Sequence, residues 1–266
     1  MARNSSSPGV RPAVKQLRES LISVRRQLHA NPELSWKEFA TQRLILEHLT
    51  TLGLKDVRPV AGTGVTALLE GGHRGPCVAW RADIDALPIP EKTGLPYASR
   101  NPGVMHACGH DAHTAIALTI AAVIAARRQS LAGSVRFIFQ PAEESSGGAQ
   151  SCIDDGVLDH PAVSRVFGLH VSADVPVGAI NVASGPFFAS PTSITITING
   201  RGGHAAAPHQ SVDAVVVAAH AIVALQTIVS RSVAPSDTAV LTIGTLQAGF
   251  WSNVIAQSAT LSGTRD

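Results

Sequence analysis

The chain has 266 residues, enough to bury a full hydrophobic core in one or two domains. Hydrophobic residues make up 45% and charged residues only 15%, which indicates that much of the secondary structure is covered on both sides, as in a parallel sheet flanked by helices. The formal net charge of +2 gives no electrostatic case for nucleic acid or a membrane as a partner, so we expect neither.

The ends and the cysteines favour a cytoplasmic protein. Residues 1–13 are mostly polar and lack an apolar h-region, so they predict a flexible leader and not a signal peptide. The longest nearly apolar run, 115–126, is too short to cross a bilayer. Cys77, Cys108 and Cys152 are odd in number and widely spaced, which argues against a disulfide framework.

Helical and extended patterns follow one another over residues 14–186 and predict an α/β domain. Apolar residues at spacings of three and four predict a helix from about residue 14 to 28. A capping-box pattern at Ser35 predicts a second helix to about residue 52, and Asp111 is expected to cap a buried helix from residue 112. Strands are expected at residues 64–70, 77–82, 134–140, 165–171 and 177–183.

The pattern changes near Pro186. Residues 193–199 alternate as a half-exposed strand, Ser211 is expected to cap a helix, and further strands are expected at 239–246 and 259–263. This order predicts a second, smaller α+β domain over residues 187–266.

Side chains of the kinds that bind a borderline-soft divalent metal follow several predicted strands. They are Asp83 and Asp85, Cys108 and His110, Glu143 and Glu144, and His170. Ligands collect at the carboxyl ends of strands in open α/β sheets, so this coincidence predicts a metal site. Taken singly, the histidine could be a core residue and the paired glutamates a solvated face.

Several short segments resemble the dinuclear metal amidohydrolases related to aminoacylases and zinc carboxypeptidases, most closely the hippurate and indole-acetyl-amino-acid (auxin-conjugate) hydrolases. The matching segments are 26–34, 81–88, 106–111, 140–144, 168–170, 202–205 and 253–255. The Cys-Gly-His-Asp element at 108–111 is specific to this branch. The resemblance implies a zinc-peptidase-like catalytic domain, with a central mixed sheet flanked by helices. It also implies a smaller, ferredoxin-like α+β lid domain through which two copies dimerise.

The resemblance also implies a ligand set for two divalent ions, zinc, manganese or a similar metal: Cys108, His110, Glu144 and His170. Glu143 corresponds to the general base that takes a proton from a metal-activated water and returns it to the leaving amine. A fifth ligand, a histidine near the C-terminus, is found in complete family members.

Residues of the second domain complete the implied site. His204 corresponds to a histidine that stabilises the developing oxyanion in a partner subunit, and Asn253 to a residue that holds the substrate carboxylate. A loop histidine and a turn-forming asparagine are the structural alternatives. Four further residues are expected to orient the ligands, or else to act as caps and structural carboxylates. They are Asp83, Asp85, Asp111 and His113.

Two departures from the family pattern stand out. Gln257 replaces a usual acidic residue. The sequence ends where relatives are in the middle of the second domain, so we expect a C-terminally truncated form in which both domains are incomplete and the fifth ligand is missing.

The leading hypothesis is a metal-dependent amidohydrolase that hydrolyses N-acyl amino acids, such as hippurate-like or auxin-conjugate-like compounds. One alternative is a catalytically inactive metal-binding and dimerisation remnant of such an enzyme. Another is a cysteine hydrolase, with Cys108 as the nucleophile and His110 or His113 as the base.

Overall fold

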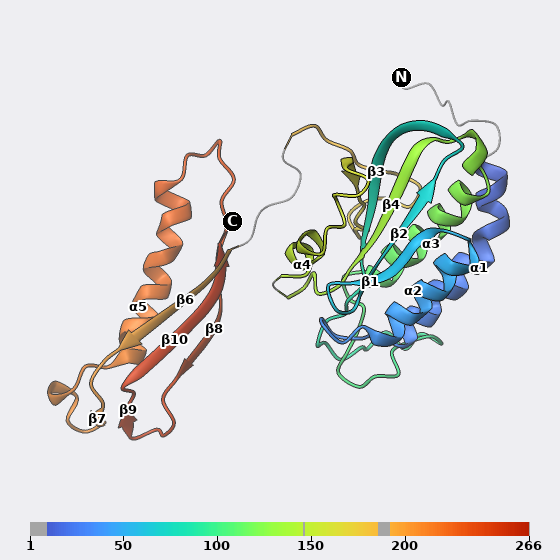
Figure 1. The fold of residues 1–266 in the computed structure, drawn as a ribbon. Helices are drawn as coiled ribbons and strands as arrows, with labels where there is room; N and C mark the ends of the chain where they lie inside the picture. The colour runs from blue at the N-terminus through green and yellow to red at the C-terminus, as the bar shows by residue number, and fades with distance from the viewer. Residues whose placement is uncertain (1–9, 146, 186–191, 266) are drawn as a thin grey trace. The chain divides into compact units, whose positions relative to one another are not determined.

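The computed structural model describes residues 10–145, 147–185 and 192–265 (Figure 1). The chain forms two compact units, Met1–Ala179 and Ile180–Asp266. The expected boundary at 186/187 lies outside the described residues, as do residues 1–9 of the expected leader. Residues 10–13, which we had assigned to the leader, belong to the first helix.

The first unit is a five-stranded mixed sheet covered by helices (Figure 1). Its helices are α1 (Val10–Ala30), α2 (Phe39–Thr51), α3 (His110–Ala125), a 3-10 turn (Arg128–Ser130) and α4 (Gly148–Asp154), and its strands are β1 (Lys55–Val60), β2 (Gly64–Glu70), β3 (His73–Asp83), β4 (Ala132–Gln140) and β5 (Val163–Phe167). The strand order is β1-β2-β4-β3-β5. The pairs β1–β2 and β2–β4 are antiparallel, whereas β3 runs parallel to both β4 and β5.

Each face of this sheet has its own core. On one face, Phe137 and Phe139 of β4 pack with Ile45 of α2 and Leu118 of α3. On the other face, Ile138 packs with Cys152 of α4. Because neighbouring residues of β4 point to opposite faces and both faces are covered, the strand is buried over most of its length, including Arg136.

The start of α2 corrects one prediction. Ser35 does not cap this helix, because its hydroxyl donates to the Asp85 carboxylate, 2.6 Å away. The Glu33 carboxylate instead accepts hydrogen bonds from the backbone N–H groups of Ala40 and Thr41, at 3.0 and 2.8 Å. The predicted capping box at Ser35 was therefore wrong, and a carboxylate from outside that motif accepts from the first amides of the helix.

The last two strands predicted for this region also need correction. β5 ends at Phe167, so His170 lies beyond the strand and not within it. Within the described residues, 177–183 form turns and irregular chain, with Val177, Ile180 and Val182 largely exposed. Strand propensity needs a neighbouring strand to be realised, and the described chain provides none there.

The second unit is a three-stranded antiparallel sheet with one helix (Figure 1). Its elements are β6 (Thr192–Asn199), β7 (Gly203–His204), a 3-10 turn (Pro208–Gln210), α5 (Ala214–Thr227), a π-helical turn (Ile228–Ser232), β8 (Leu241–Ala248), β9 (Val254–Ile255) and β10 (Ser258–Arg265). The sheet order is β6-β10-β8, and β7 and β9 form a separate short ribbon. The mixed sheet with helices and the small antiparallel domain together confirm the predicted fold class.

Helix α5 lies on this sheet through small residues. Ala214 and Ala218 are fully buried against Leu261 of β10. The helix is capped by Asp213, whose carboxylate accepts from the N–H groups of Val215 and Val216, and not by Ser211 as predicted. The Asp213 side chain lies one residue before the helix, where a capping acceptor reaches the first free amides.

One helical stretch of the described chain, Ala214–Ser232, is long and apolar enough to cross a bilayer by length and composition alone. A helix that packs on a sheet in a soluble protein passes the same test, so this is weak evidence for a membrane segment. The sequence interpretation overlooked the stretch, because it considered only the apolar run at 115–126.

Candidate metal centre

The parallel part of the sheet brings the predicted ligands together. Asp83, the last residue of β3, pairs with Gln140, the last residue of β4. Chain segments that leave the carboxyl ends of β3, β4 and β5 therefore start at the same edge, which is where binding sites form in such sheets. Asp85, the Glu143–Glu144 pair and His170 all lie on these segments.

Helix α3 adds the Cys-Gly-His element at the same edge. Its N-cap is Gly109, with φ of 88°. A Cβ atom at this position would lie 2.4 Å from the Cγ2 atom of Val171, so both backbone angle and space require glycine. The sharp turn places Cys108 before the helix and His110 at its first position.

The candidate ligand atoms lie close enough together to share a metal ion. The Cys108 Sγ atom is 3.2 Å from Nε2 of His170. The Nε2 atom of His110 is 3.8 Å from a Glu144 oxygen and 4.0 Å from a Glu143 oxygen. An ion about 2.0–2.3 Å from each ligand atom spans such separations.

His110 gives the strongest indication that a metal belongs here. Its side chain is 1% exposed, and its Nε2 atom has no hydrogen-bond partner among the described residues. Its Nδ1 atom donates to the backbone oxygen of Asp85 at 2.9 Å, so in the neutral imidazole Nε2 carries the lone pair. A buried, unpartnered nitrogen surrounded by thiol and carboxylate groups fits a metal ligand.

Asp85 holds two of the candidate ligands in place. One carboxylate oxygen accepts from the Ser35 hydroxyl and from the backbone N–H of Glu144, at 2.6 and 3.0 Å, and the other lies 3.2 Å from Nδ1 of His110. Burial alone would raise the pKa of Asp85, but the hydrogen bonds from His110 and Ser35 lower it. The arrangement supports the expected positioning role.

Asp83 and His113 form a second supporting pair. Nδ1 of His113 is 2.5 Å from an Asp83 oxygen, and its Nε2 atom accepts from the backbone N–H of Val171 at 3.0 Å. Although burial opposes it, the hydrogen bond from His113 and the charge of Arg81 lower the pKa of Asp83 to about 2. With both ring nitrogens of His113 engaged, this geometry supports a positioning role.

Asp111 has a different role from the one its sequence position indicated. Its fully buried carboxylate pairs with Nε of Arg25 and Nδ1 of His29, at 2.8 and 2.7 Å, and does not cap α3. The sequence interpretation gave Arg25 no role, and it gave His29 none beyond membership of a matching segment. An arginine and a histidine four apart on one helical face were the available signal.

Burial and charge set the protonation of the two remaining polar groups. Burial, with the charges of Asp83 and Glu144, raises the pKa of Glu143. Burial and the charge of Glu144 raise the pKa of the Cys108 thiol to about 12. Without a cation, this thiol is therefore protonated at neutral pH, whereas a bound metal favours its thiolate form.

The second unit brings its two predicted residues together. His204 of β7 pairs with Val254 of β9, and the N–H of Ala205 donates to the backbone oxygen of Asn253 at 3.0 Å. Both His204 and Asn253 are exposed. The short ribbon thus carries an imidazole and an amide on neighbouring segments.

The chain belongs to peptidase family M20/M25/M40, whose sequence pattern matches residues 79–260. It is 47% identical over 249 residues to an N-acetyl-L-cysteine deacetylase of Bacillus subtilis (strain 168), covering 93% of this chain and 59% of that protein. It is 41% identical over 244 residues to the IAA-amino acid hydrolase ILR1-like 4 of Arabidopsis thaliana, covering 92% of this chain and 55% of that protein.

A solved structure shares the fold. It is that of the YXEP protein of Bacillus subtilis, described as a dinuclear metal-binding peptidase of the M20 family. The TM-score is 0.74 at 42% identity, over 94% of this chain and 64% of that one. These matches confirm the family resemblance and the predicted fold class. The chain spans about 59% of the deacetylase.

Proposed function

We propose that this protein is a metal-dependent amidohydrolase that cleaves the amide bond of N-acyl amino acids. The observation that carries the proposal is the cluster of thiol, imidazole and carboxylate groups at the carboxyl ends of the parallel strands. The deacetylase and the IAA-amino acid hydrolase among its relatives are named for reactions of this class. Hippurate-like and auxin-conjugate-like compounds are therefore the first substrates to test.

The proposed ligands for two divalent ions, zinc or manganese, are Cys108, His110, Glu144 and His170. Bound divalent ions at such a site lower the pKa of water and polarise a carbonyl oxygen. His110 is already fixed for this task by Asp85, and the backbone N–H of Glu144 is held by the same carboxylate.

Glu143 is the proposed general base. Its side chain is 40% exposed, so substrate and water can reach it, while Glu144 beside it is 22% exposed. A raised pKa makes a carboxylate a stronger base, so Glu143 can take a proton from the attacking water and give it to the leaving amine.

Two residues of the second unit are the remaining proposed contacts. His204, acting from a partner copy, would donate to the oxyanion that develops on the scissile carbonyl, and Asn253 would hold the substrate carboxylate. The backbone link between Ala205 and Asn253 supports this assignment, since it fixes these two segments relative to each other.

The cysteine-hydrolase alternative is less well supported. Of the expected bases, His113 uses both ring nitrogens, whereas Nε2 of His110 remains available. The thiol itself disfavours a cysteine nucleophile, because burial and the charge of Glu144 raise the pKa of Cys108 to about 12. Iodoacetamide and a chelator separate the two mechanisms. A metal-dependent enzyme loses activity in chelator and regains it with zinc or manganese, whereas a cysteine hydrolase resists the chelator and is inactivated by alkylation.

The decisive test is hydrolysis of hippurate and N-acetyl-L-cysteine by the metal-loaded chain, with the Glu143→Gln variant alongside. We expect turnover by the wild type, its loss in the variant and unchanged metal content in both, because the amide cannot accept the proton. Glu47→Gln, an exposed change on α2, is the matched control. Retained activity in Glu143→Gln would exclude its role as base. A metal-loaded chain without turnover would support the remnant alternative.

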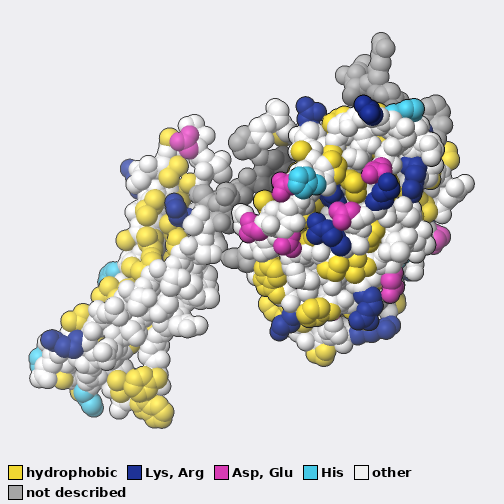
Figure 2. All heavy atoms as spheres, in the orientation of Figure 1, with side chains coloured by type: hydrophobic (Ala, Val, Ile, Leu, Met, Phe, Trp, Pro, Cys, Tyr) yellow, Lys and Arg dark blue, Asp and Glu magenta, His cyan; other side chains and the backbone are white. Residues whose placement is uncertain are grey.

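We also propose that two copies associate through the second unit. Valines of α5 are exposed although the helix packs on its own sheet, with Val216 at 51% and Val223 at 69% exposure. Figure 2 shows hydrophobic side chains along the surface of this helix. Such a face is more stable when covered, and a second copy offers the same face in return. Sedimentation equilibrium of the purified chain tests for the dimer.

A further inference from the structure

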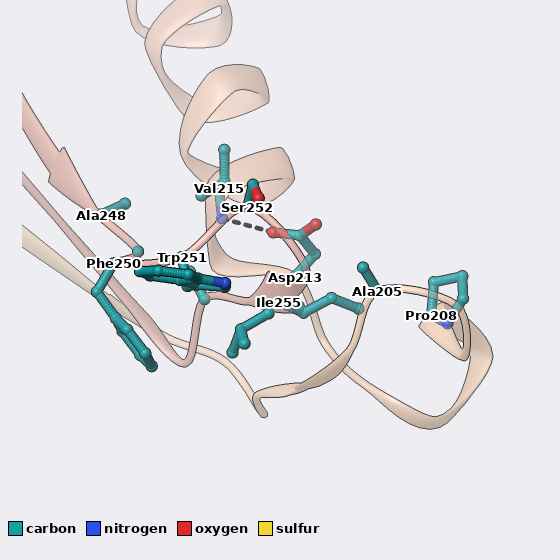
Figure 3. A pocket seen from close by; sticks show the side chains of 12 residues that line it. Ala205, Pro208, Asp213, Val215, Ala248, Phe250, Trp251, Ser252 and Ile255 are labelled. Atoms are coloured by element: carbon teal, nitrogen blue, oxygen red, sulfur yellow. Dashed lines mark hydrogen bonds between the residues drawn. The ribbon is translucent and has the colours of Figure 1, made fainter.

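The second unit contains a cavity of about 620 Å³ beside the ribbon of β7 and β9 (Figure 3). Its walls come from the start of α5, the end of β8 and the loop that joins β8 to β9. A volume of this size lies within the range of pockets that bind small molecules. The metal cluster is not part of the cavity, whose lining residues all belong to the second unit.

Two aromatic side chains, Phe250 and Trp251, line this cavity and are unusually exposed. Their exposed fractions are 83% and 69%. They follow Gly249, whose φ of 64° turns the chain at the end of β8. The turn closes with a 3.3 Å hydrogen bond from the N–H of Val254 to the backbone oxygen of Trp251, so the aromatic pair is held beside β9. Large aromatic groups exposed together at a cavity are typical of a binding surface.

The aromatic pair lies directly before a proposed substrate contact. Asn253 follows Trp251 by two residues. It does not itself line the cavity, but the residues on either side of it, Ser252 and Val254, do, so it lies at the edge of the cavity. Val254 is also the strand partner of His204. The cavity, the proposed carboxylate contact and the proposed oxyanion donor are therefore built on one short ribbon.

The charge of the lining decides which group it suits. Among the described residues that line it there is no lysine, arginine or histidine, and these residues offer no cation to a carboxylate. Its single acid, Asp213, already accepts hydrogen bonds from the N–H groups of Val215 and Val216 at the start of α5. Ser252 contributes one hydroxyl, and the other lining side chains are aromatic rings and aliphatic groups, which favour an apolar group.

We propose that Phe250 and Trp251 form the specificity site for the amino-acid side chain of the substrate, selecting N-acyl amino acids whose side chain is aromatic or large and apolar. This inference rests on the proposed function, in which Asn253 holds the substrate carboxylate. Carboxylate and side chain are attached to the same carbon of an amino acid, whereas the acyl group lies across the scissile bond. A surface next to Asn253 therefore meets the side chain.

Four substrates vary the amino-acid side chain and the acyl group independently: N-acetylglycine, N-acetyl-L-phenylalanine, N-benzoylglycine and N-benzoyl-L-phenylalanine. We expect the metal-loaded wild type to prefer phenylalanine over glycine in kcat/KM with either acyl group. Trp251→Ala should reduce this preference about tenfold, the scale expected for an apolar contact in a specificity pocket, and leave the acetyl-to-benzoyl ratio unchanged. Trp251→Phe should retain most of the preference.

The control is Phe39→Ala, which removes a comparably exposed aromatic ring (60%) from the first unit. It should leave all four rates unchanged. The proposal is overturned if Trp251→Ala slows all four substrates equally, or if the preference for phenylalanine persists. It is also overturned if the variant changes only the oligomeric state, because the aromatic pair would then be an interface between copies.

Failure of the proposed function gives a different result, with none of the four substrates turned over by the wild type. Saturation-transfer NMR on the same chain then tests the site directly, with N-acetyl-L-phenylalanine and N-acetylglycine as ligands. Transfer to the phenyl ring that is lost in Trp251→Ala supports the aromatic site independently of catalysis. Equal transfer in wild type and variant, or none in either, refutes it.

Discussion

Removal of the Asp85 carboxylate should weaken metal binding without removing any proposed ligand. This fully buried side chain accepts from the Ser35 hydroxyl and the Glu144 N–H through one oxygen and faces His110 through the other. It therefore positions two of the four proposed ligands at once. Loss of such supporting contacts costs about 10- to 100-fold in metal affinity in other metal sites.

Two variants separate the contributions of these contacts to metal affinity. In Asp85→Asn, the amide oxygen can still accept from Ser35 and Glu144, and only the side-chain contact to His110 is lost. Nδ1 of His110 still donates to the backbone oxygen of residue 85, at 2.9 Å. We expect a loss of about tenfold, or 1.4 kcal/mol. Asp85→Ala removes all three contacts, so its loss should approach 100-fold.

Calorimetric titration with zinc, in competition with a chelator of known affinity, measures both variants. Asp154→Asn, which alters an exposed carboxylate on α4, serves as the control and should bind zinc as the wild type does. Circular dichroism confirms that each variant is folded. If Asp85→Ala binds zinc with wild-type affinity, the prediction is refuted, because the proposed ligands would then bind the metal equally well without the contacts of the Asp85 carboxylate.

Two further predictions concern the buried acids of the metal-free protein. Asp111→Ala should lower the unfolding free energy by about 3–5 kcal/mol in urea titrations, because Arg25 and His29 lose their buried partner; a change below about 1 kcal/mol, as at a surface ion pair, would contradict this. The pKa of Asp83 falls from 3.8 to about 2 on folding, so its ionised carboxylate stabilises the folded protein above pH 4. About 2 kcal/mol of unfolding free energy is lost as the pH falls towards 2. Asp83→Asn should reduce the slope of a plot of unfolding free energy against pH between pH 4 and 2. An unchanged slope would show that Asp83 does not cause this loss.

Local sequence pattern predicted the elements well where one face or both are regularly buried. Strand β2 has the predicted bounds, Gly64–Glu70, because six of its seven residues are buried and turn residues flank it. The strand predicted at 177–183 failed because the same apolar pattern has no partner there in the described chain. Strand formation depends on a neighbour that local pattern does not specify.

The candidate site was predictable in its members but not in its connections. Residue type and position at strand ends identified Cys108, His110 and the glutamate pair, and the parallel strands bring them together. Asp111 looked like a helix cap because aspartate is common there, yet it is paired with Arg25, 86 positions earlier in the sequence. The spacing of Arg25 and His29 places them on one helical face, but which acid they meet is decided by packing at that separation and cannot be taken from local sequence.

The hydrogen bond from the Val171 N–H to Nε2 of His113 has a consequence for the kinetics of metal uptake. It ties the peptide that follows His170 to helix α3, whose first residue is His110. The hydrogen bond therefore fixes the backbone next to His170 relative to the helix that carries His110. His110 is buried and already held by Asp85, so capture of an ion needs rotation of the exposed side chains only and not slower ordering of a loop. The rate of loading should therefore be set by the ion's encounter with the site and the loss of its hydration shell.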